Sequence, residues 1–495
     1  MFSTIQDLIF FYRDRICHLL KLQGNHGYIV GGFVRDIFLE RETNDVDIAV
    51  NGNALTIAEA VAEEIGGKFV VLDRVNKIAR VVVLEEERQW HMDFSSFSGD
   101  IESDLARRDF TIDAMAIDLV GLSADSPLKI IDPFSGREDI KNKVLRAVSD
   151  GTFEDDAVRL LKAVRLAAEF GFEIEQHTEL LIRECSQFLS KVAGERIREE
   201  LIRLLHLPGA VHNLRRLDNL GLLKVMLPEM MDGKGVGQPT VHFWDIFEHS
   251  LQTVATLEFI MHESDWEYSN GEMLTTAIWS EEIEEHLSME VSKGSNHRVL
   301  LKIAALLHDV AKPRTKILDD NGRARFLGHA KQGAELVIKI MERLRFSGRE
   351  TRLVEDMVMH HLHPVQMSTE GLPSSKAVYR YFRDRGDSAI DVLLLALADF
   401  LACLGPLATM EGWRKHCQLI SYILEEHKEQ QAKISPVKIV NGHDLMDKFG
   451  LASGPLLGEL LKMLGEAQAS GDINNREEAL ALVEKELNKQ RCGAR

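Results

Sequence analysis

The sequence has little cysteine and no cysteine pattern of the kind that binds structural zinc. Its 495 residues include five cysteines, at positions 17, 185, 403, 417 and 492, and no two of them form a C-x-x-C pair. This spread excludes a zinc ribbon and a disulfide framework, and it indicates a reducing compartment.

The sequence also shows no pattern typical of a targeting segment or a membrane span. Residues 1–22 begin without a basic n-region, and charges interrupt their apolar residues, which predicts an amphipathic helix and not a signal peptide. The most apolar later segment, 391–410, is interrupted by Asp399 and Pro406, so we expect a buried helix there. We therefore predict a cytoplasmic protein without a membrane partner.

Basic residues are outnumbered, because 59 lysines and arginines face 78 aspartates and glutamates, for a net charge of −19. Such a chain attracts nucleic acid poorly at long range, and phosphate contacts would need a local basic cleft. Three basic groups are clustered enough to line one: Arg107 and Arg108; Arg159, Lys162 and Arg165; and Arg196, Arg198 and Arg203. Much of the acidity lies in 262–290, and we interpret 262–296 as an acidic, poorly constrained insertion.

The chain is long enough for two to four domains, and its pattern changes along its length. Strands are predicted at 28–31, 45–50, 68–72, 78–84 and 90–94, with a helix at 54–65. From about 153 onward the pattern is helical, with breaks at Gly171-Phe172 and at Pro208-Gly209. We predict an α+β fold with domains at 1–150, 151–235, 236–405 and 406–495, of which the last three are all helical.

The most informative stretch is 28–47, where an apolar strand leads into Gly31-Gly32 and a short helix carrying Arg35. Two glycines let the backbone approach a polyphosphate at a helix N-terminus. Asp45 and Asp47 follow on a second strand, and alternation places both on one face. Two such carboxylates repel each other unless a cation lies between them, which predicts a Mg²⁺ site.

These residues resemble the first motif of the class II tRNA nucleotidyltransferase and poly(A) polymerase family. The resemblance implies a head with the polymerase-β-like nucleotidyltransferase fold, built on a mixed or antiparallel sheet. It also implies two metal ions held by Asp45 and Asp47, and transfer of a nucleotide from an NTP to an RNA 3′-hydroxyl. Gly32 and Arg35 then belong to the nucleotide site. Asp93 is the candidate third catalytic carboxylate, with a structural capping role as the alternative.

Two further motifs resemble the same family. In Arg107-Arg108-Asp109-Phe110-Thr111-Ile112-Asp113-Ala114 the second arginine implies a triphosphate contact, and Asp113 stands where the family usually has asparagine. The series Asp156, Arg159, Lys162 and Arg165, spaced by three, predicts a row on one helix. An Asp and an Arg one turn apart can present an acceptor and a donor to the edge of a base. The alternative is an intrahelical ion pair.

A third group of residues lies on predicted helices in the second half of the chain. His249, His308-Asp309 and Asp399 resemble the ligands of an HD phosphohydrolase domain, which holds a divalent metal whose identity the sequence does not specify. His329, His360 and His361 could extend this site to a second ion. The resemblance therefore spans nearly the whole chain, as a nucleotidyltransferase head, a neck with the nucleotide-selecting helix and RNA-binding region, an HD domain and a C-terminal region.

The connection after Asp93 decides between substrate hypotheses. Only ten residues separate Asp93 from Asp104. Family members that build a complete CCA end usually have a longer loop here, and those that add only CC tend to lack it. We predict a tRNA nucleotidyltransferase that adds CCA from CTP and ATP, with CC addition as a close alternative and poly(A) synthesis third. Two other classes are an HD phosphohydrolase with a regulatory N-terminal half and a non-catalytic RNA-binding scaffold. No pattern specifies an oligomeric state.

Overall fold

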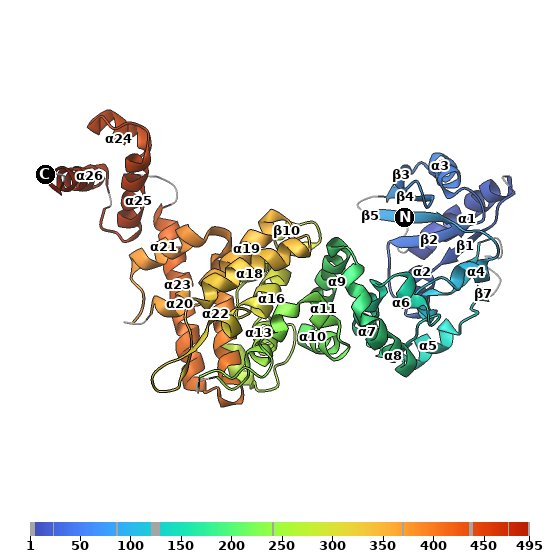
Figure 1. Ribbon diagram of the computed structural model, residues 1–495. Helices are drawn as coiled ribbons and strands as arrows, with labels where there is room; N and C mark the ends of the chain where they lie inside the picture. The colour runs from blue at the N-terminus through green and yellow to red at the C-terminus, as the bar shows by residue number, and fades with distance from the viewer. Residues whose placement is uncertain are drawn as a thin grey trace. The chain divides into compact units, whose positions relative to one another are not determined.

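A computed structural model describes residues 5–493 except 23, 86–87, 120–128, 240–241, 369–370, 435–438 and 474 (Figure 1). The chain forms two compact units. The N-terminal unit comprises residues 1–204 and 216–226, and the C-terminal unit comprises 205–215 and 227–495. The four-domain division made from the sequence is finer than this one and stays a prediction.

A seven-stranded mixed sheet lies at the centre of the N-terminal unit, in the order β3-β4-β5-β2-β1-β6-β7. The strands are β1 (Gly27–Val30), β2 (Asp45–Val50), β3 (Lys68–Asp73), β4 (Ile78–Glu85), β5 (Arg88–Ser96), β6 (Ala116–Asp118) and β7 (Ile130–Ile131). β2 and β5 run parallel, and the other neighbours in this sheet are antiparallel. The five predicted strands are confirmed, whereas β6 and β7 are too short to show alternation.

Helices pack on this sheet and follow it. α3 (Ala54–Ile65) contacts β3, β4, β5 and α1 (Ile5–Leu22) through buried residues such as Ile57 and Val61. The short helices around the nucleotide motifs are α2 (Gly32–Phe38), α4 (Ile101–Leu105), η1 (Thr111–Asp113) and α5 (Gly136–Asn142). A small parallel pair of strands, β8 (Val144–Leu145) and β9 (Glu173–Ile174), ties the following helical region to the end of the head.

The helical region after residue 150 begins with α6 (Thr152–Asp155) and α7 (Arg159–Phe170). It continues through α8 (Gln176–Cys185), η2 (Ser186–Lys191), α9 (Gly194–His206), α10 (Ala210–Asn219), α11 (Leu222–Met226) and α12 (Pro228–Met231). The predicted break at Gly171 is confirmed, because Gly171 ends α7 in the left-handed conformation with φ 66°. The prediction that Asp156 shares a helix with Arg159 is wrong, since Asp156 is extended and α7 begins three residues later.

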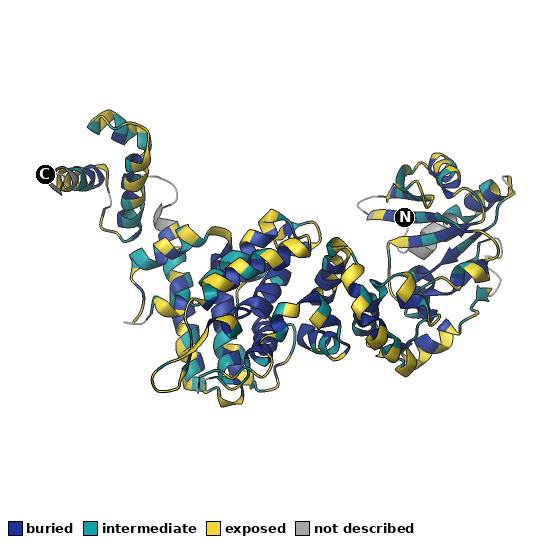
Figure 2. Cartoon of the chain, in the orientation of Figure 1, coloured by how far each residue is buried: buried dark blue, intermediate teal, exposed yellow. Residues whose placement is uncertain are grey.

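Three buried helices form the core of the C-terminal unit: α13 (Ile246–Ile260), α16 (His297–Leu307) and α22 (Ala389–Leu404). Almost every residue of α13 and α16 is buried, which Figure 2 shows as continuous dark blue. α18 (His329–Arg343) packs on α19 (Gly348–His360), and α19 packs on α16. α22 belongs to the one segment of the described chain, 375–407, that is apolar and long enough to cross a membrane, but 61% of its most apolar window is buried inside the protein.

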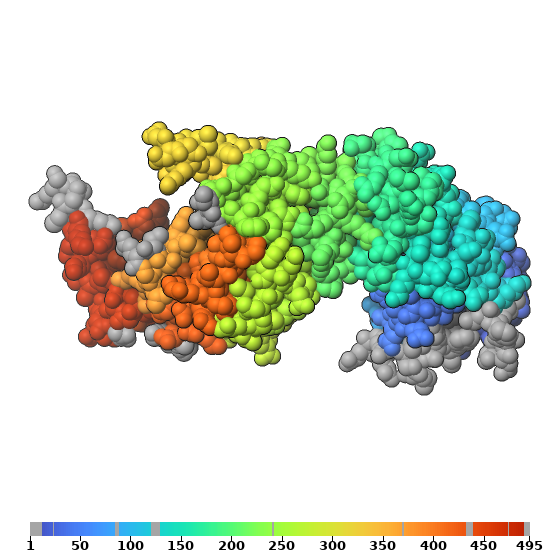
Figure 3. Space-filling view, turned by 90° about the horizontal axis from the view of Figure 1, so that it is seen from below, coloured from blue at the N-terminus to red at the C-terminus, as the bar shows by residue number. Residues whose placement is uncertain are grey.

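The remaining elements of the C-terminal unit surround this core. They are α14 (Gly271–Thr276), α15 (Glu281–Ser288), β10 (Glu290–Ser292), β11 (Ser295–Asn296), α17 (Lys312–Thr315), β12 (Lys316–Leu318), β13 (Ala324–Phe326), α20 (His363–Gln366), α21 (Ser375–Arg385), η3 (Gly386–Ser388), η4 (Gly405–Leu407), α23 (Met410–Ile434), α24 (Gly442–Phe449), α25 (Pro455–Ala469) and α26 (Arg476–Gly493). α25 packs against α21 and α23, so the red C-terminal residues border the orange ones in Figure 3. α24, α25 and α26 enclose a hydrophobic cluster of their own.

The interpretation of 262–296 as a poorly constrained insertion is wrong. Trp266, Met273, Ile283 and Leu287 are buried, and the indole of Trp266 donates a hydrogen bond to Gln252 of α13 (3.0 Å). Arg298 of α16 donates to Glu263 (2.8 Å) and also pairs with Glu284, so acidic residues of the segment are neutralised by the core. The segment is an ordered part of the C-terminal unit, because its apolar residues pack into the core. The sequence did not indicate this, since these apolar residues are widely spaced among charged ones.

Candidate nucleotidyltransferase and metal sites

The Gly31-Gly32 turn brings the backbone against two charged side chains. Gly31 precedes α2 with φ 71°, a conformation that disfavours any residue with a Cβ. A Cβ at this position would also lie 2.6 Å from Nη1 of Arg108 and 3.2 Å from Oδ2 of Asp47. Glycine is therefore required here by both backbone conformation and space, and the turn, Arg108 and Asp47 form one compact site.

The two carboxylates of the Asp-x-Asp motif lie on one face of the sheet but differ in environment. Asp45 is 64% exposed and accepts a hydrogen bond from Nδ1 of His91 (2.8 Å). Asp47 is partly buried beside Arg108, and desolvation raises its pKa to about 6. Arg108 opposes this rise, whereas the negative charges of Asp93, Asp113 and Asp45 add to it.

Asp93 faces Asp47 from the neighbouring parallel strand, as the register Asp47↔Asp93 requires. Both oxygens of Asp93 accept from Arg80 of β4, at 2.7 and 2.8 Å. The structure thus brings Asp93, the candidate third carboxylate, to the site and pairs it with the guanidinium of Arg80. The capping role considered from the sequence does not occur, because Asp93 lies inside β5.

This cluster fits a divalent cation such as Mg²⁺. Carboxylate oxygens are the ligands that Mg²⁺ prefers. Asp45 and Asp47 supply them from one face of β2, and Asp93 lies opposite Asp47 on β5. The raised pKa of Asp47 shows that its ionised form is disfavoured here, and a nearby cation would stabilise that form.

Arg35 and Lys162, both predicted to bind nucleotide, are held by a buried carboxylate. Asp113 is 5% exposed and accepts from Nη1 of Arg35 (2.6 Å) and from Nζ of Lys162 (3.4 Å). Burial favours the neutral acid, but Arg35, Lys162 and Arg108 outweigh it and lower the pKa of Asp113. Lys162 also pairs with Asp109. Sequence reasoning missed Asp113 as the centre of this network, although aspartate in place of the family's asparagine was the signal.

The other members of the predicted row are also paired. Arg196 of α9 donates to both oxygens of Asp156, at 2.9 and 2.7 Å. Arg159 donates to the carbonyl oxygens of Thr152 (3.1 Å) and Arg107 (2.9 Å). Arg165 donates to Glu200 (2.7 Å) and Glu169 (2.8 Å). The predicted basic cleft is therefore largely neutralised by neighbouring carboxylates.

Arg108 differs from these cations. Its Nη2 reaches Asp104 at 3.4 Å, while its Nε is buried without a hydrogen-bond partner among the described residues. The Arg108 guanidinium lies beside Gly31 and Asp47, where its terminal N–H groups can donate to a phosphate oxygen. Arg108 is thus a predicted nucleotide ligand that lies against both the glycine turn and Asp47.

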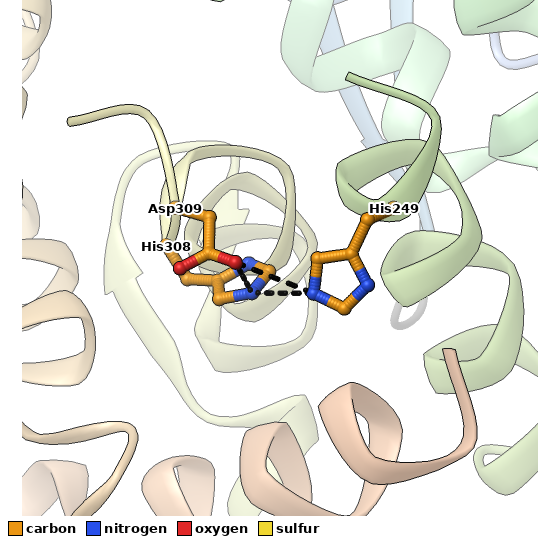
Figure 4. Close-up of side chains that lie close together, drawn as sticks. All are labelled: His249, His308 and Asp309. Carbon is orange, nitrogen blue, oxygen red and sulfur yellow. Dashed lines mark hydrogen bonds and ion pairs between the residues drawn. The ribbon is translucent and has the colours of Figure 1, made fainter. Parts of the chain in front are cut away.

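In the C-terminal unit, the four residues of the predicted HD set converge from three helices. His249 comes from α13, and His308 and Asp309 follow the end of α16 (Figure 4). Asp399 comes from α22. Nε2 of His249 lies 3.2 Å from Nε2 of His308, 3.3 Å from Oδ2 of Asp309 and 3.0 Å from Oδ1 of Asp399. His249, His308 and Asp309 are at most 1% exposed, so a charge among them is poorly solvated.

Asp309 also faces a second set of imidazoles. Its Oδ1 lies 3.4 Å from Nε2 of His329 and 3.9 Å from Nε2 of His361. The two histidine sets therefore share one carboxylate, which can bridge two ions. His360, predicted as a possible member of this set, is elsewhere, with its Nε2 3.6 Å from Asp356. Sequence reasoning missed Lys312, whose Nζ lies 2.5 Å from Oδ2 of Asp309 one helical turn later.

Backbone carbonyls orient three of these imidazoles. Nδ1 of His308, His329 and His361 donates to the carbonyl oxygens of Ala305, Phe326 and Val358, at 2.8, 2.7 and 2.7 Å. A carbonyl oxygen only accepts, so each Nδ1 carries a proton and each Nε2 points at Asp309. This is the arrangement of metal-binding histidines.

The charge balance of the site also fits divalent metal. Burial lowers the pKa of His361 to about 4, so this ring is neutral and can bind a metal ion. Burial would also lower the pKa of His308, but Asp309 and Asp399 raise it to about 10. A bound cation would replace that proton as the partner of the two carboxylates. A cavity of about 440 Å³, lined by His329, His361, Lys312, Arg325 and Asp399 among others, adjoins the site.

Comparison with known proteins places this geometry in a family. The poly A polymerase head domain matches residues 27–146, and the "Probable RNA and SrmB-binding site of polymerase A" matches 171–233. The HD domain matches 246–402, and the family model named "tRNA nucleotidyltransferase domain 2" matches 407–483. The A-adding tRNA nucleotidyltransferase of Deinococcus radiodurans is 32% identical over 92% of this chain and 94% of that protein. The chain belongs to the tRNA nucleotidyltransferase family. It is an enzyme of that family with an HD domain.

Other relatives agree on the family and differ in their products. The CC-adding tRNA nucleotidyltransferase of Thermus thermophilus is 32% identical over 92% of each chain. The Thermotoga maritima CCA-adding enzyme complexed with tRNA has a TM-score of 0.63 and 23% identity over 97% of this chain and 95% of that chain, a likeness that shows the shared fold. The predicted α+β fold, with a mixed-sheet head followed by helical regions, is confirmed.

Proposed function

We propose that this tRNA nucleotidyltransferase transfers cytidylates from CTP to the 3′ end of tRNA and stops after CC. The observation that supports this is the connection between β5 and α4. Only residues 97–100 separate Ser96, the end of β5, from Ile101, the start of α4.

Both ends of this connection are fixed. Phe97 is 6% exposed, and its backbone N–H donates to the carbonyl oxygen of Val50 (2.9 Å). Asp100 caps α4 by accepting from the N–H of Ser103 (2.8 Å). Four residues anchored in this way lack the reach of the longer loop through which complete CCA-adding members are thought to switch the pocket to ATP. Full CCA addition, which the sequence placed first, therefore becomes the alternative.

The residues of the N-terminal unit suit in-line nucleotidyl transfer. The oxygen of the tRNA 3′-hydroxyl forms a bond to the α-phosphorus of CTP, the bond to pyrophosphate breaks, and the hydroxyl proton passes to solvent. Asp45 and Asp47, with Asp93 alongside, would hold Mg²⁺, which supplies Lewis-acid stabilisation of the attacking and leaving oxygens. Arg108 contacts the triphosphate, and Asp156 with Arg159 reads the cytosine edge.

The product can be tested with purified full-length protein and two tRNAs, one without its CCA end and one ending in CC. We expect CTP alone to extend the first tRNA by two nucleotides, and ATP to add nothing to either tRNA. Products are resolved to single nucleotides on a denaturing gel. Extension of the second tRNA by ATP would contradict CC addition. If ATP extends the second tRNA and CTP also adds two cytidines to the first, the enzyme adds the full CCA end. If ATP extends the second tRNA and CTP adds nothing to the first, the enzyme adds A alone.

Base selection gives a sharper test of Asp156. We expect Asp156→Ala to reduce the preference for CTP over UTP by about 10- to 100-fold, because a bidentate contact to a base is worth about 1–3 kcal/mol. Single-turnover rates with each nucleotide provide the measurement.

The matched control for this test is Arg196→Ala, which removes the ion pair of Asp156 and leaves the carboxylate in place. If Asp156 reads the base, Arg196→Ala retains the preference for CTP. Equal loss of preference in the two variants would instead assign Asp156 to the Arg196 ion pair.

The C-terminal unit supports a second activity. We infer that the HD site, with Asp309 bridging two sets of histidines, hydrolyses phosphoesters of small anionic substrates that enter the adjoining cavity. An HD enzyme with a merely regulatory head would require a damaged nucleotidyltransferase site. Gly31, Asp47 and Arg108 instead retain a tight mutual geometry, which supports an active head.

A further inference from the structure

A second cluster of metal-ligand side chains lies in the C-terminal unit, outside the HD site. Oδ2 of Asp391 lies 3.1 Å from Nε2 of His286 and 2.9 Å from Nδ1 of His297. The three ligand atoms are all within 4.8 Å of one another. Neither the nucleotidyltransferase site nor the HD site uses any of these residues.

All three side chains are buried, which makes their charges costly without compensation. Asp391 is fully buried, while His286 is 8% and His297 is 3% exposed. Oδ1 of Asp391 is also buried and has no hydrogen-bond partner among the described residues. A buried carboxylate with one unsatisfied oxygen is disfavoured by several kcal/mol unless a positive charge lies close to it. Among the described residues, the two imidazoles are the donors that reach the other oxygen.

We propose that His286, His297 and Asp391 form a zinc site. Two imidazole nitrogens and a carboxylate oxygen are a usual zinc set, and donors about 2 Å from one zinc ion are about 3.3 Å from each other. The 2.9 and 3.1 Å separations from Oδ2 of Asp391 need only a small opening to admit the ion. The free Oδ1 can complete the coordination or accept from a zinc-bound water.

One of the three residues, His297, borders a cavity. His297 lines a cavity of about 370 Å³ whose wall also includes Arg349, Arg352 and Arg385. Water or a small anion in this cavity could reach the fourth position on the metal, which three protein ligands leave open.

A zinc ion bound here would link the acidic segment 262–296 to two helices of the core. His286 lies on α15 within 262–296, His297 begins α16, and Asp391 is in the first turn of α22. α16 and α22 run on to His308 and Asp399 of the HD site. Zinc would therefore fix, at their first turns, the same two helices that carry HD ligands further along.

The test measures zinc in full-length protein after dialysis against buffer containing excess Mg²⁺. We expect His286→Gln to lose about one zinc ion per chain relative to wild type. The matched control is His360→Gln, which replaces a helix-borne histidine of the same unit outside both clusters and should keep all the zinc. Wild-type protein without bound zinc, or equal zinc in wild type and His286→Gln, would overturn the proposal.

A second variant separates loss of a ligand from loss of fold. His286→Cys keeps a zinc ligand at this position, so we expect it to retain the metal. When Co²⁺ replaces zinc, the spectrum should show a thiolate-to-cobalt charge-transfer band that wild type lacks. If His286→Cys retains no metal, or binds Co²⁺ without this band, the ion is not at this position and the proposal fails.

Discussion

The Asp47→Asn variant is expected to transfer no measurable nucleotide and yet to unfold at a higher temperature than the wild type in chelator. Loss of transfer follows because Asp47 is the less exposed member of the proposed Mg²⁺-binding pair, and metal ligands contribute several kcal/mol to such reactions. The rate should fall by at least about 10³-fold. The gain in stability follows because the neutral amide avoids the cost of ionising a carboxylate in this environment.

The pH dependence fixes the sign of the stability effect. Burial raises the pKa of Asp47 in the folded protein from 3.8 to about 6, so the folded chain holds its proton more tightly than the unfolded chain. The contribution of Asp47 to the free energy of unfolding of the wild type is fully present below pH ~4 and is lost as the pH rises through ~6. The advantage of Asp47→Asn should therefore appear between these values and reach about 1–3 kcal/mol at neutral pH.

Thermal melts from pH 5 to 8, with chelator and with Mg²⁺, measure this prediction. The matched control is Asp45→Asn, which removes the other carboxylate of the motif from a position that is 64% exposed. It should impair transfer and leave the stability of the metal-free protein nearly unchanged. Mg²⁺ should stabilise wild type and not Asp47→Asn. A variant at Asp47 that still adds nucleotides at the wild-type rate would remove the catalytic assignment.

The Asp309→Asn variant is expected to lose both ions of the HD site and all phosphodiesterase activity, while nucleotide addition to tRNA continues. Asp309 is the single carboxylate shared by the two histidine sets, so its replacement weakens both sets together. We expect hydrolysis of a chromogenic phosphodiester, supplied with Mn²⁺, to fall by at least about 10³-fold.

Asp399→Asn is the matched control for this effect. Asp399 lies 3.0 Å from His249 and 3.6 Å from His308, and no ion pair joins it to His329 or His361 in the described structure. This variant should lose the ion on the His249 side and retain the other, as counted by metal analysis against wild type. Loss of tRNA nucleotide addition in Asp309→Asn would show that the two activities are not separable.

Parts of this structure follow from local sequence pattern, and parts depend on contacts between distant residues. The strands that carry Asp45, Asp47 and Asp93 could be predicted because polar and apolar residues alternate from Asp45 to Ile48 and along β5 around Asp93. The start of α7 could not, since the extended conformation of Asp156 accompanies its ion pair with Arg196, 40 residues away. Local spacing alone made Asp156 and Arg159 look like neighbours on one helix.

The HD residues illustrate the same limit. His249 and His308 are 59 residues apart, and only resemblance to a known motif grouped them before the structure was available. The network around Asp113 was missed because its partners, Arg35 and Lys162, come from elements 78 and 49 residues away. The acidic segment was misjudged because its many charges obscured five buried apolar residues and His286.

Substitution of Gly31 alone is expected to abolish nucleotide transfer by the head. Every other amino acid adds a Cβ that would collide with the guanidinium of Arg108 and crowd the carboxylate of Asp47, in a backbone conformation that already disfavours it. One missense change there would disturb both the proposed triphosphate ligand, Arg108, and the proposed metal ligand, Asp47, although it alters neither residue. Inactive alleles at position 31 are thus expected to be as severe as those at positions 47 and 108, and no second-site change at only one of those positions should restore activity.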